Sequence, residues 1–391
     1  MDNLIQTMMC LIRYEIMQEP LPEAIREGLS GDALKSLYRL SKAHDLAHLV
    51  GAALDENQLL LQEAPVSEKF RKQTMMAIYR YQQLQYELNQ ICNVLEEAKI
   101  PFIPLKGSVL RQYYPQPWMR TSCDIDILVH ERDLQIAAIV LIEKLQYQLL
   151  EKEKGRHDWS LYSPSGVHLE LHFGLVEPGR ANSANEILNQ IWENVTRSSL
   201  QKEYHLNLTD PMFYFYHIAH MAKHFEVGGC GVRPFIDLWI LNHRMPYNEN
   251  IRKELLKKGG LTSFEEAAVN LSEVWMNGTE PNELVITMQN FILSGGAFGN
   301  VENRVAAQQK KRGGKFRYIL SRVFLPYSLM RLQYPVLKKH KWLLPIMEVR
   351  RWIQHIFSGG LKRSTNEIKI NQSMSAEKQS ETAWMMEQLG L

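Results

Sequence analysis

The segment Cys123-Asp-Ile-Asp-Ile-Leu-Val129 decides the fold, because apolar residues that alternate with two acids are typical of a strand with one buried face. Successive side chains of a strand point to opposite faces, so Ile125 and Ile127 are expected in a core. Asp124 and Asp126 are expected side by side on the other face. Two carboxylates in such positions repel each other unless a cation neutralises them, and Mg²⁺ prefers oxygen ligands of this kind. The segment therefore predicts a divalent metal site.

A second alternating segment, Val167-His-Leu-Glu-Leu-His-Phe173, lies downstream, and the turn before it predicts a hairpin with residues 159–162. Its apolar residues predict a buried face, and His168, Glu170 and His172 share the other face. If this strand pairs beside the first, Glu170 completes a cluster of three carboxylates, which can hold two metal ions for a phosphoryl displacement. The two histidines are interpreted as hydrogen-bonded residues of the strand face. Direct contact with the metal is not expected from them, because Mg²⁺ disfavours nitrogen ligands.

A short strand is expected at Ile100 to Leu105, and Lys106-Gly107-Ser108 follows it at a strand-to-helix junction. Glycine lets a backbone approach a phosphate, and the N–H groups at the start of a helix point at an anion. Ser108 adds a hydroxyl donor, Lys106 adds a positive charge, and Arg120 is placed to reach a triphosphate as well. These residues form the predicted phosphate-binding part of a nucleotide site.

Together these motifs resemble those of the DNA polymerase β-like nucleotidyltransferase superfamily. Their residues are most similar to the motifs of a group of bacterial proteins named uncharacterised nucleotidyltransferases. The resemblance covers roughly residues 95–245. Fifteen residues separate Ser108 from Asp124, slightly more than is usual in the superfamily. The spacing leaves open whether Lys106 or Arg120 contacts phosphate. The segments that carry the resemblance are Leu105-Lys-Gly-Ser108, Pro117-x-x-Arg120, Asp124-Ile-Asp-Ile-Leu-Val129, His168-Leu-Glu-Leu-His172, His217-x-x-His220-x-x-Lys223-His224 and Arg233-x-x-x-Asp237.

The resemblance implies a minimal mixed sheet with helices, followed by a helical domain that helps to hold the nucleotide. It implies that Asp124 and Asp126 bind metal. It also implies that Glu170 is the third carboxylate, either as a metal ligand or as the base on an acceptor hydroxyl.

Two sets of residues in the helical region carry further expectations. By resemblance, His220, Lys223 and His224 line the nucleotide cleft, although packing and hydrogen bonding explain the histidines about as well. Arg233 and Asp237 lie one helical turn apart, and that spacing predicts a structural ion pair.

The pattern along the whole chain predicts an α+β protein in four parts. Residues 67–98 contain no Pro or Gly and predict one long helix or two closely joined helices. The four parts are an N-terminal helical region (1–95), a nucleotidyltransferase core (96–205), a helical nucleotide or substrate domain (206–300) and a basic helical C-terminal region (301–391) whose end is expected to be partly disordered.

Charge is uneven along a chain whose net charge is only +2. Residues 304–363 contain fifteen Lys or Arg and one acid, Glu348. Such a segment is either a solvated or packed helical region or a patch for a polyanion such as RNA. The stretch Lys341–Met347 is not expected to lie on a membrane surface, because Pro345 interrupts its amphipathic pattern.

The remaining features favour a cytoplasmic enzyme. The four cysteines form no CxxC pair, and the sequence has neither a basic leader nor a run of about 18 apolar residues. The expected reaction is Mg²⁺- or Mn²⁺-dependent transfer of a nucleoside monophosphate from an NTP, ATP among them, with pyrophosphate leaving. The acceptor is a hydroxyl or phosphate of an RNA, protein, peptide, sugar or small molecule. Two alternatives stay open: a phosphotransferase that uses the same carboxylates, and a non-enzymatic RNA- or protein-binding module.

Overall fold

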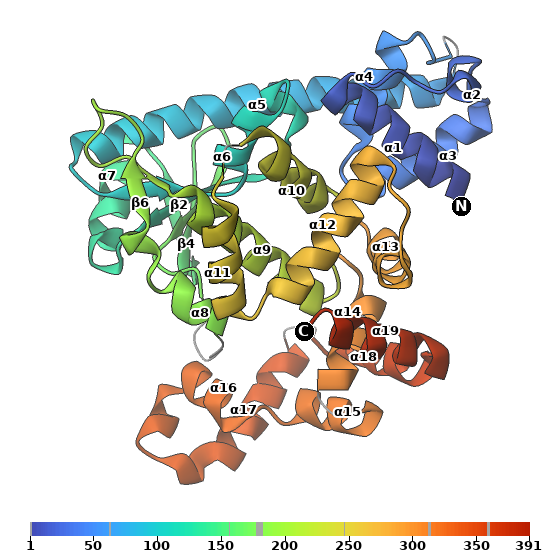
Figure 1. Cartoon of the computed structure of the whole chain (residues 1–391). Helices are drawn as coiled ribbons and strands as arrows, with labels where there is room; N and C mark the ends of the chain where they lie inside the picture. Colours follow the sequence, from blue (N-terminus) through green and yellow to red (C-terminus); the bar gives the residue numbers. More distant parts are fainter. Residues whose placement is uncertain are drawn as a thin grey trace. The chain divides into compact units, whose positions relative to one another are not determined.

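The computed structural model describes residues 2–61, 64–155, 157–176, 183–245, 247–311, 314–357 and 360–391. The chain divides into two compact units, of which the first consists of residues 1–219 and 233–280 and the second of residues 220–232 and 281–391. The described residues are mostly helical and include a five-stranded mixed sheet, which confirms the predicted α+β class (Figure 1). None of the described helices combines the length and the apolar character that crossing a membrane requires.

The first unit begins with helices that pack against one long helix, α5 (Pro65–Glu97). Helix α5 is continuous, so the region expected to hold one helix or two contains one. In Figure 1 it runs from the N-terminal helices to the sheet, where it contacts α7 (Leu134–Leu145). The other N-terminal helices are α1 (Asp2–Met17), α2 (Glu23–Arg26), α3 (Gly31–Ala43) and α4 (Ala47–Glu56).

Glu15 on α1 is buried, and its Oε1 has no hydrogen-bond partner among the described residues. Burial, followed by the charge of Glu56, raises the pKa of Glu15 from 4.5 to about 7. A pKa that is raised in the folded state contributes stability that is complete below the unfolded value and is lost as the pH rises through the folded value. We therefore expect Glu15→Gln to leave the free energy of unfolding unchanged at pH 4 and to raise it by about 1–2 kcal/mol at pH 8.

Urea unfolding at the two pH values measures this difference. Glu19→Gln, which removes one charge from a side chain that is 45% exposed, is the matched control. If Glu15→Gln changed the free energy of unfolding equally at both pH values, ionisation of the Glu15 carboxyl would not be the cause of that change.

The sheet of the first unit has the strand order β1-β2-β5-β4-β3. Strands β2 and β5 are parallel, and the other neighbouring pairs are antiparallel. The hairpin expected between residues 159–162 and the second acidic strand is formed by β4 and β5. The strands are β1 (Phe102–Pro104), β2 (Asp124–Val129), β3 (Gln148–Lys154), β4 (Asp158–Tyr162) and β5 (His168–His172).

Short elements connect the strands, and four longer helices follow the sheet. Helix α9 crosses from the first unit to the second after Ala219. The longer helices are α9 (Asp210–Glu226), α10 (Arg233–Arg244), α11 (Glu249–Gly259) and α12 (Thr262–Asn277). The short elements are α6 (Gly107–Leu110), α8 (Ser183–Leu188), the 3₁₀ helices η1 (Arg111–Tyr113), η2 (Pro117–Met119), η3 (Glu131–Asp133) and η4 (Ile191–Glu193), and the paired strands β6 (Val195–Arg197) and β7 (Leu206–Leu208).

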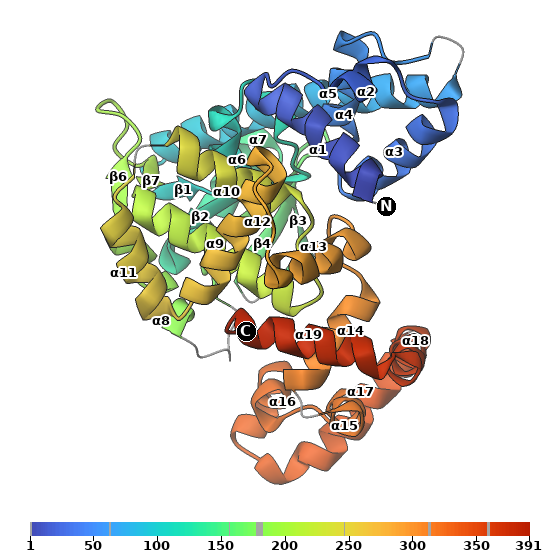
Figure 2. The ribbon, with the colours of Figure 1, turned by 45° about the vertical axis from the view of Figure 1, so that its right-hand side comes forward.

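One face of the sheet packs against α5 and α7 and forms a hydrophobic core. Ile125, Ile127, Leu169 and Leu171 are all buried in this core, as the alternation in the sequence predicts. Figure 2 shows α9 and α10 in front of the sheet and α7 behind it. The acids that alternate with these apolar residues therefore lie on the face that is turned away from α5 and α7.

In the second unit, all regular elements among the described residues after Glu280 are helices. Residues 364–391 include the end of α18 and all of α19. Helix α19 packs against α13 and α14, and its Met385 and Met386 are buried. The elements are α13 (Glu283–Gly295), α14 (Val301–Lys311), α15 (Lys315–Val323), α16 (Tyr327–Gln333), η5 (Pro335–Lys338), η6 (Lys341–Leu343), α17 (Leu344–Phe357), α18 (Gly360–Ser373) and α19 (Ala376–Gln388).

Candidate active site

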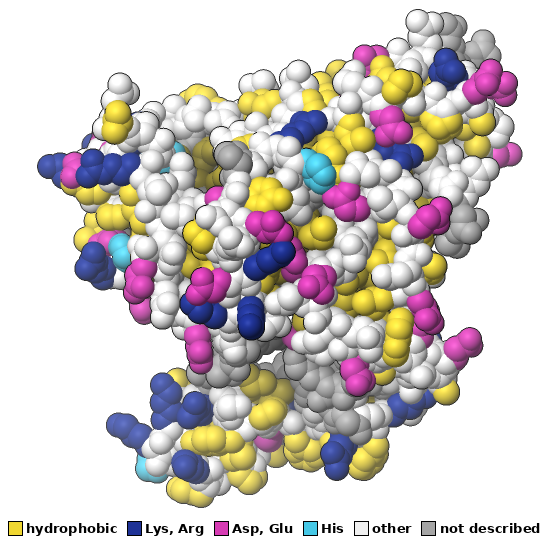
Figure 3. Space-filling model, in the orientation of Figure 1, with side chains coloured by type: hydrophobic (Ala, Val, Ile, Leu, Met, Phe, Trp, Pro, Cys, Tyr) yellow, Lys and Arg dark blue, Asp and Glu magenta, His cyan; other side chains and the backbone are white. Residues whose placement is uncertain are grey.

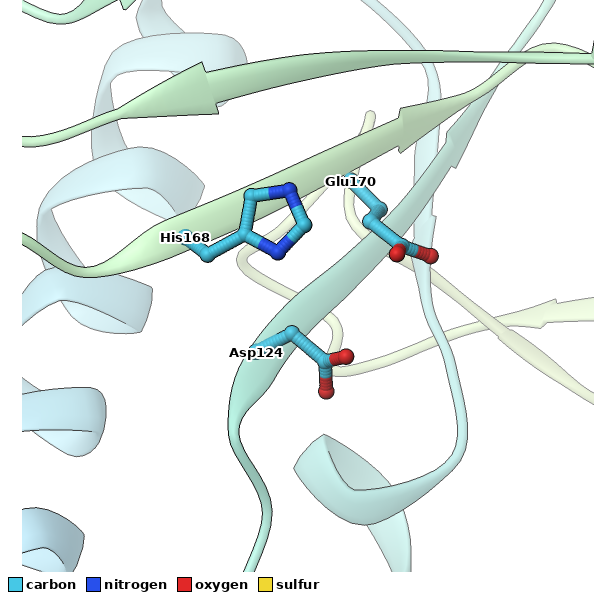
Figure 4. A group of neighbouring side chains, drawn as sticks. All are labelled: Asp124, His168 and Glu170. Carbon is cyan, nitrogen blue, oxygen red and sulfur yellow. The ribbon is translucent and has the colours of Figure 1, made fainter. Parts of the chain in front are cut away.

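The candidate site is built on β2 and β5, which lie side by side. Their register places Asp126 directly opposite Glu170 and Asp124 opposite His168. Because side chains alternate along each strand, the three acids share one face of the sheet. Figure 4 shows Asp124, His168 and Glu170 projecting from the two strands on the same side. The strand pairing on which the predicted place of Glu170 depends is therefore confirmed.

Two overlapping sets of side chains can hold a metal ion. One set is Asp124, His168 and Glu170, and the other is Asp126, Glu170 and His172. Within each set the ligand atoms all lie within 4.8 Å of one another. Glu170 belongs to both sets, as a carboxylate shared between two ions would, and the carboxylates supply the hard oxygen donors that Mg²⁺ and Mn²⁺ prefer. The donor set therefore fits one or two divalent ions.

Asp126 is the most buried of these acids and has two basic partners. Lys106 Nζ lies 2.7 Å from its Oδ1, and His172 Nε2 lies 2.9 Å from the same atom. Burial alone raises the pKa of Asp126, but the charge of Lys106 and the hydrogen bond from His172 hold that pKa well below its usual range. Asp126 is therefore ionised at neutral pH.

His172 joins two of the acids. Its Nε2 lies 2.9 Å from Asp126 Oδ1 and 3.2 Å from Glu170 Oε2. Burial lowers the pKa of His172, but its hydrogen bonds to Asp126 and Glu170 outweigh burial and raise the pKa to about 9. The hydrogen bond between His172 and Glu170 also lowers the pKa of Glu170. His172 is thus the hydrogen-bonded strand residue that was expected, and it also positions two carboxylates.

Asp124 has the opposite electrostatic environment. Its pKa is raised, first by burial and then by the negative charges of Asp126 and Glu170. A cluster in which one carboxyl is pushed toward its neutral form while its neighbours stay ionised carries an excess of negative charge. A divalent cation relieves such an excess.

The segment Lys106-Gly107-Ser108 follows β1 and begins α6, of which Gly107 and Ser108 are the first two residues. Lys106 has a φ of 45°, which few non-glycine residues adopt. Gly107 packs so closely that a Cβ added to it would lie 3.2 Å from the Cβ of Ser122. Ser108 Oγ is buried and has no hydrogen-bond partner among the described residues. A buried hydroxyl without a partner fits a polar ligand such as a phosphate oxygen.

Arg120, the other residue expected at the triphosphate, has a different partner. Its Nε donates to both carboxylate oxygens of Asp237, at 2.8 and 3.0 Å, and the hydroxyl of Tyr114 donates to Asp237 Oδ1 at 2.7 Å. This arrangement favours a structural role for Arg120. The expected pair between Arg233 and Asp237 is wrong, because Arg233 Nη1 lies 2.7 Å from Asp45 Oδ2.

The three residues expected in the nucleotide cleft lie on the last part of α9, in the second unit. The Nε2 atoms of His220 and His224 lie 3.1 Å apart, as the spacing of four residues on a helix allows. Contact of His220, Lys223 and His224 with a nucleotide stays a prediction.

Two buried residues near the acids were not predicted from the sequence. Arg111 donates from Nε to Gly107 O at 2.8 Å and from Nη2 to Ser122 Oγ at 2.9 Å. Arg111 follows Gly107 by four residues, about one helical turn, and this spacing is the feature of the sequence that indicates its contact with Gly107. Tyr216 on α9 is buried near the charges of Lys106 and Asp126, and burial is the first cause of its raised pKa. Nothing local in the sequence indicates this neighbour.

Comparison with known families identifies the chain. Residues 31–277 match the model of the family described as uncharacterised nucleotidyltransferase. The matched range is more than half of the chain and contains the acids of β2 and β5, Lys106-Gly107-Ser108 and the whole of α9. No curated protein matches the chain. The chain belongs to the uncharacterised nucleotidyltransferase family.

Proposed function

We propose that this protein transfers a nucleoside monophosphate from an NTP, ATP among the candidates, to an acceptor hydroxyl or phosphate and releases pyrophosphate. We further propose that it belongs to the bacterial group within the DNA polymerase β-like superfamily and acts in the cytoplasm, where its four free cysteines stay reduced. One observation carries the proposal. The parallel pairing of β2 with β5 gathers Asp124, Asp126 and Glu170 on one face of the sheet, as metal-dependent phosphoryl displacement requires.

In this proposal the three carboxylates hold one or two Mg²⁺ or Mn²⁺ ions. Bound there, the ions supply positive charge to the phosphates at the reacting centre. Asp126 contributes a ligand that is ionised at neutral pH. His172 holds Glu170 by a hydrogen bond that also favours its ionised form. Glu170 is therefore either the third ligand or the acceptor of the proton that leaves the acceptor hydroxyl.

The triphosphate is proposed to lie at Lys106-Gly107-Ser108. Contact of His220, Lys223 and His224 with the nucleotide is a separate expectation that rests on the resemblance to the family. Arg120 acts through Asp237 to position the start of β2. An oxygen of the acceptor forms a new bond to the α-phosphorus, and the bond from that phosphorus to the oxygen of the β-phosphate breaks. The acceptor proton passes to Glu170, or to water where Glu170 is a ligand, and pyrophosphate carries away the bonding electrons. Most of the rate enhancement comes from positioning and charge neutralisation.

Ser108→Ala tests the phosphate site. Because Ser108 Oγ has no hydrogen-bond partner in the described part of the chain, its removal is expected to change the free energy of unfolding by less than about 0.5 kcal/mol. A hydrogen bond to a charged group contributes about 1.5–3 kcal/mol, so the KM for the NTP is expected to rise about 10- to 100-fold. Steady-state kinetics of pyrophosphate release measures this KM.

Ser67→Ala is the matched control, because Ser67 also has a buried hydroxyl without a described partner and lies on α5, outside the site. It is expected to leave the KM unchanged. A Ser108→Ala protein with the KM of the parent would remove Ser108 from the phosphate site.

The reaction class is tested on the full chain with Mg²⁺ and a cell extract as the source of acceptors. Each NTP is supplied labelled at either the α- or the γ-phosphate. We expect the α-label to pass to an acceptor while pyrophosphate is released in equal amount. Transfer of the γ-label with release of a nucleoside diphosphate would show a phosphotransferase instead. Binding of RNA with a steep salt dependence, without turnover of any NTP, would show a non-enzymatic binding module.

A further inference from the structure

Helix α17 in the second unit exposes an apolar face. Pro345 is its second residue, in the first turn, where proline is tolerated because the N–H it lacks would have no partner inside the helix. The amphipathic pattern is therefore continuous through α17 and is not interrupted at Pro345, contrary to the expectation from the sequence. Ile346, Val349 and Ile353 are spaced three and four residues apart, which places them on one face of the helix. They are 53%, 48% and 49% exposed.

Helix α15 of the same unit exposes a second apolar face. Phe316, Leu320 and Val323 follow the same spacing, and Phe316 is 72% exposed. The end of α15 meets α17, because the rings of Phe324 and Trp352 lie 5.4 Å apart and Trp352 Nε1 donates to Val323 O at 2.8 Å. Soluble proteins seldom expose large contiguous apolar patches. Two exposed apolar faces on neighbouring helices therefore indicate an interaction surface.

The segment that carries these faces is also strongly basic. Residues 314–357 contain nine Lys or Arg and one acid, Glu348. Glu348 is buried, and its carboxylate lies 2.8 Å from Arg351. Lys338, Lys339 and Lys341 are exposed between α16 and α17. Figure 3 shows hydrophobic and basic side chains intermixed over the part that contains α15 to α17. The positive charge of this segment favours binding of an anionic partner.

We propose that α15 to α17 form a binding surface for an anionic lipid bilayer. The apolar faces of α15 and α17, with Trp342 (72% exposed), enter the boundary between headgroups and acyl chains, and the lysines contact the anionic headgroups. An RNA would use the cations and the aromatic rings, but it gives no reason to expose the aliphatic residues Ile346 and Ile353. This peripheral attachment goes beyond nucleotidyl transfer and does not rest on it.

Sedimentation of the full chain with lipid vesicles tests the proposal. We expect binding to phosphatidylcholine vesicles that contain phosphatidylglycerol and little binding to phosphatidylcholine alone. Removal of either the apolar face or the three lysines is expected to lower partitioning at least about tenfold. The apolar variant is Ile346→Ser/Val349→Ser/Ile353→Ser, and the charge variant is Lys338→Glu/Lys339→Glu/Lys341→Glu. The control, with three apolar residues of the first unit that are at least as exposed, is Met75→Ser/Tyr79→Ser/Ile136→Ser.

Circular dichroism shows whether each variant is folded, and Trp342→Ser replaces the apolar variant if that variant unfolds. NTP turnover is recorded in parallel and is expected to stay at the parent level, because none of these residues belongs to the candidate active site. Absence of binding to the anionic vesicles would overturn the proposal. So would binding that survives loss of the apolar residues, and so would capture of single-stranded RNA by a chain that does not bind vesicles.

Discussion

Asp126→Asn is expected to abolish Mg²⁺-dependent NTP turnover, with kcat lowered about a thousandfold or more, while the protein stays folded. Asp126 is 3% exposed, and its oxygens belong to a ligand set with Glu170 and His172. The amide that replaces the carboxylate is a neutral and weaker ligand for a hard cation. A bound metal ion contributes several kcal/mol of charge stabilisation in the transition state, which corresponds to the expected loss in rate.

The fold is expected to survive this substitution, because the amide keeps an oxygen that can accept the hydrogen bonds of Lys106 and His172. The charge of Lys106 is also relieved by solvent, since its side chain is 27% exposed. Pyrophosphate release measures turnover, calorimetric titration measures Mg²⁺ binding and circular dichroism measures folding. Asp55→Asn, at a side chain that is 52% exposed on α4, is the control. Full activity with undiminished Mg²⁺ affinity in the Asp126→Asn protein would refute the assignment of the site.

Asp237→Asn is expected to lower the free energy of unfolding by about 3–5 kcal/mol, because it leaves a buried guanidinium without its counter-charge. Asp237 is 0% exposed, and Arg120, which it holds through two hydrogen bonds, is 9% exposed. Burial alone raises the pKa of Asp237, but the charge of Arg120 keeps this pKa below its usual range. Asp237 is therefore ionised in the folded protein, and the whole ion pair is lost when its charge is removed.

Urea unfolding at neutral pH measures this loss. The control is Asp45→Asn, since Asp45 pairs with Arg233 at 2.7 Å but its side chain is 40% exposed. Solvent screens such a pair, so that substitution is expected to cost no more than about 1 kcal/mol. If the two substitutions lower the free energy of unfolding equally, burial of the Arg120–Asp237 pair contributes nothing to stability. A loss of turnover in folded Asp237→Asn protein would accompany a displaced β2, because Arg120 lies four residues before the first residue of that strand.

The face that carries the acids was predictable from local sequence. Asp124 and Asp126 alternate with Ile125 and Ile127, and the side-chain direction within a strand depends only on the backbone of that strand. The same reasoning placed Glu170 correctly on its own strand. Helix α5 was equally predictable, since an uninterrupted run without Pro or Gly has no local reason to break.

Only the tertiary structure decided which charges meet. The register of β2 against β5 brings Asp126 to Glu170, and it also places His172 between the two. Arg120 pairs with Asp237, a residue on a distant helix, and the expected contact of Arg120 with a phosphate stays a prediction. Such pairs form because burial removes water from a charge and makes a nearby opposite charge indispensable. Which opposite charge is nearby depends on the packing of elements far apart in the chain. The spacing of residues within one segment of the sequence does not predict that packing.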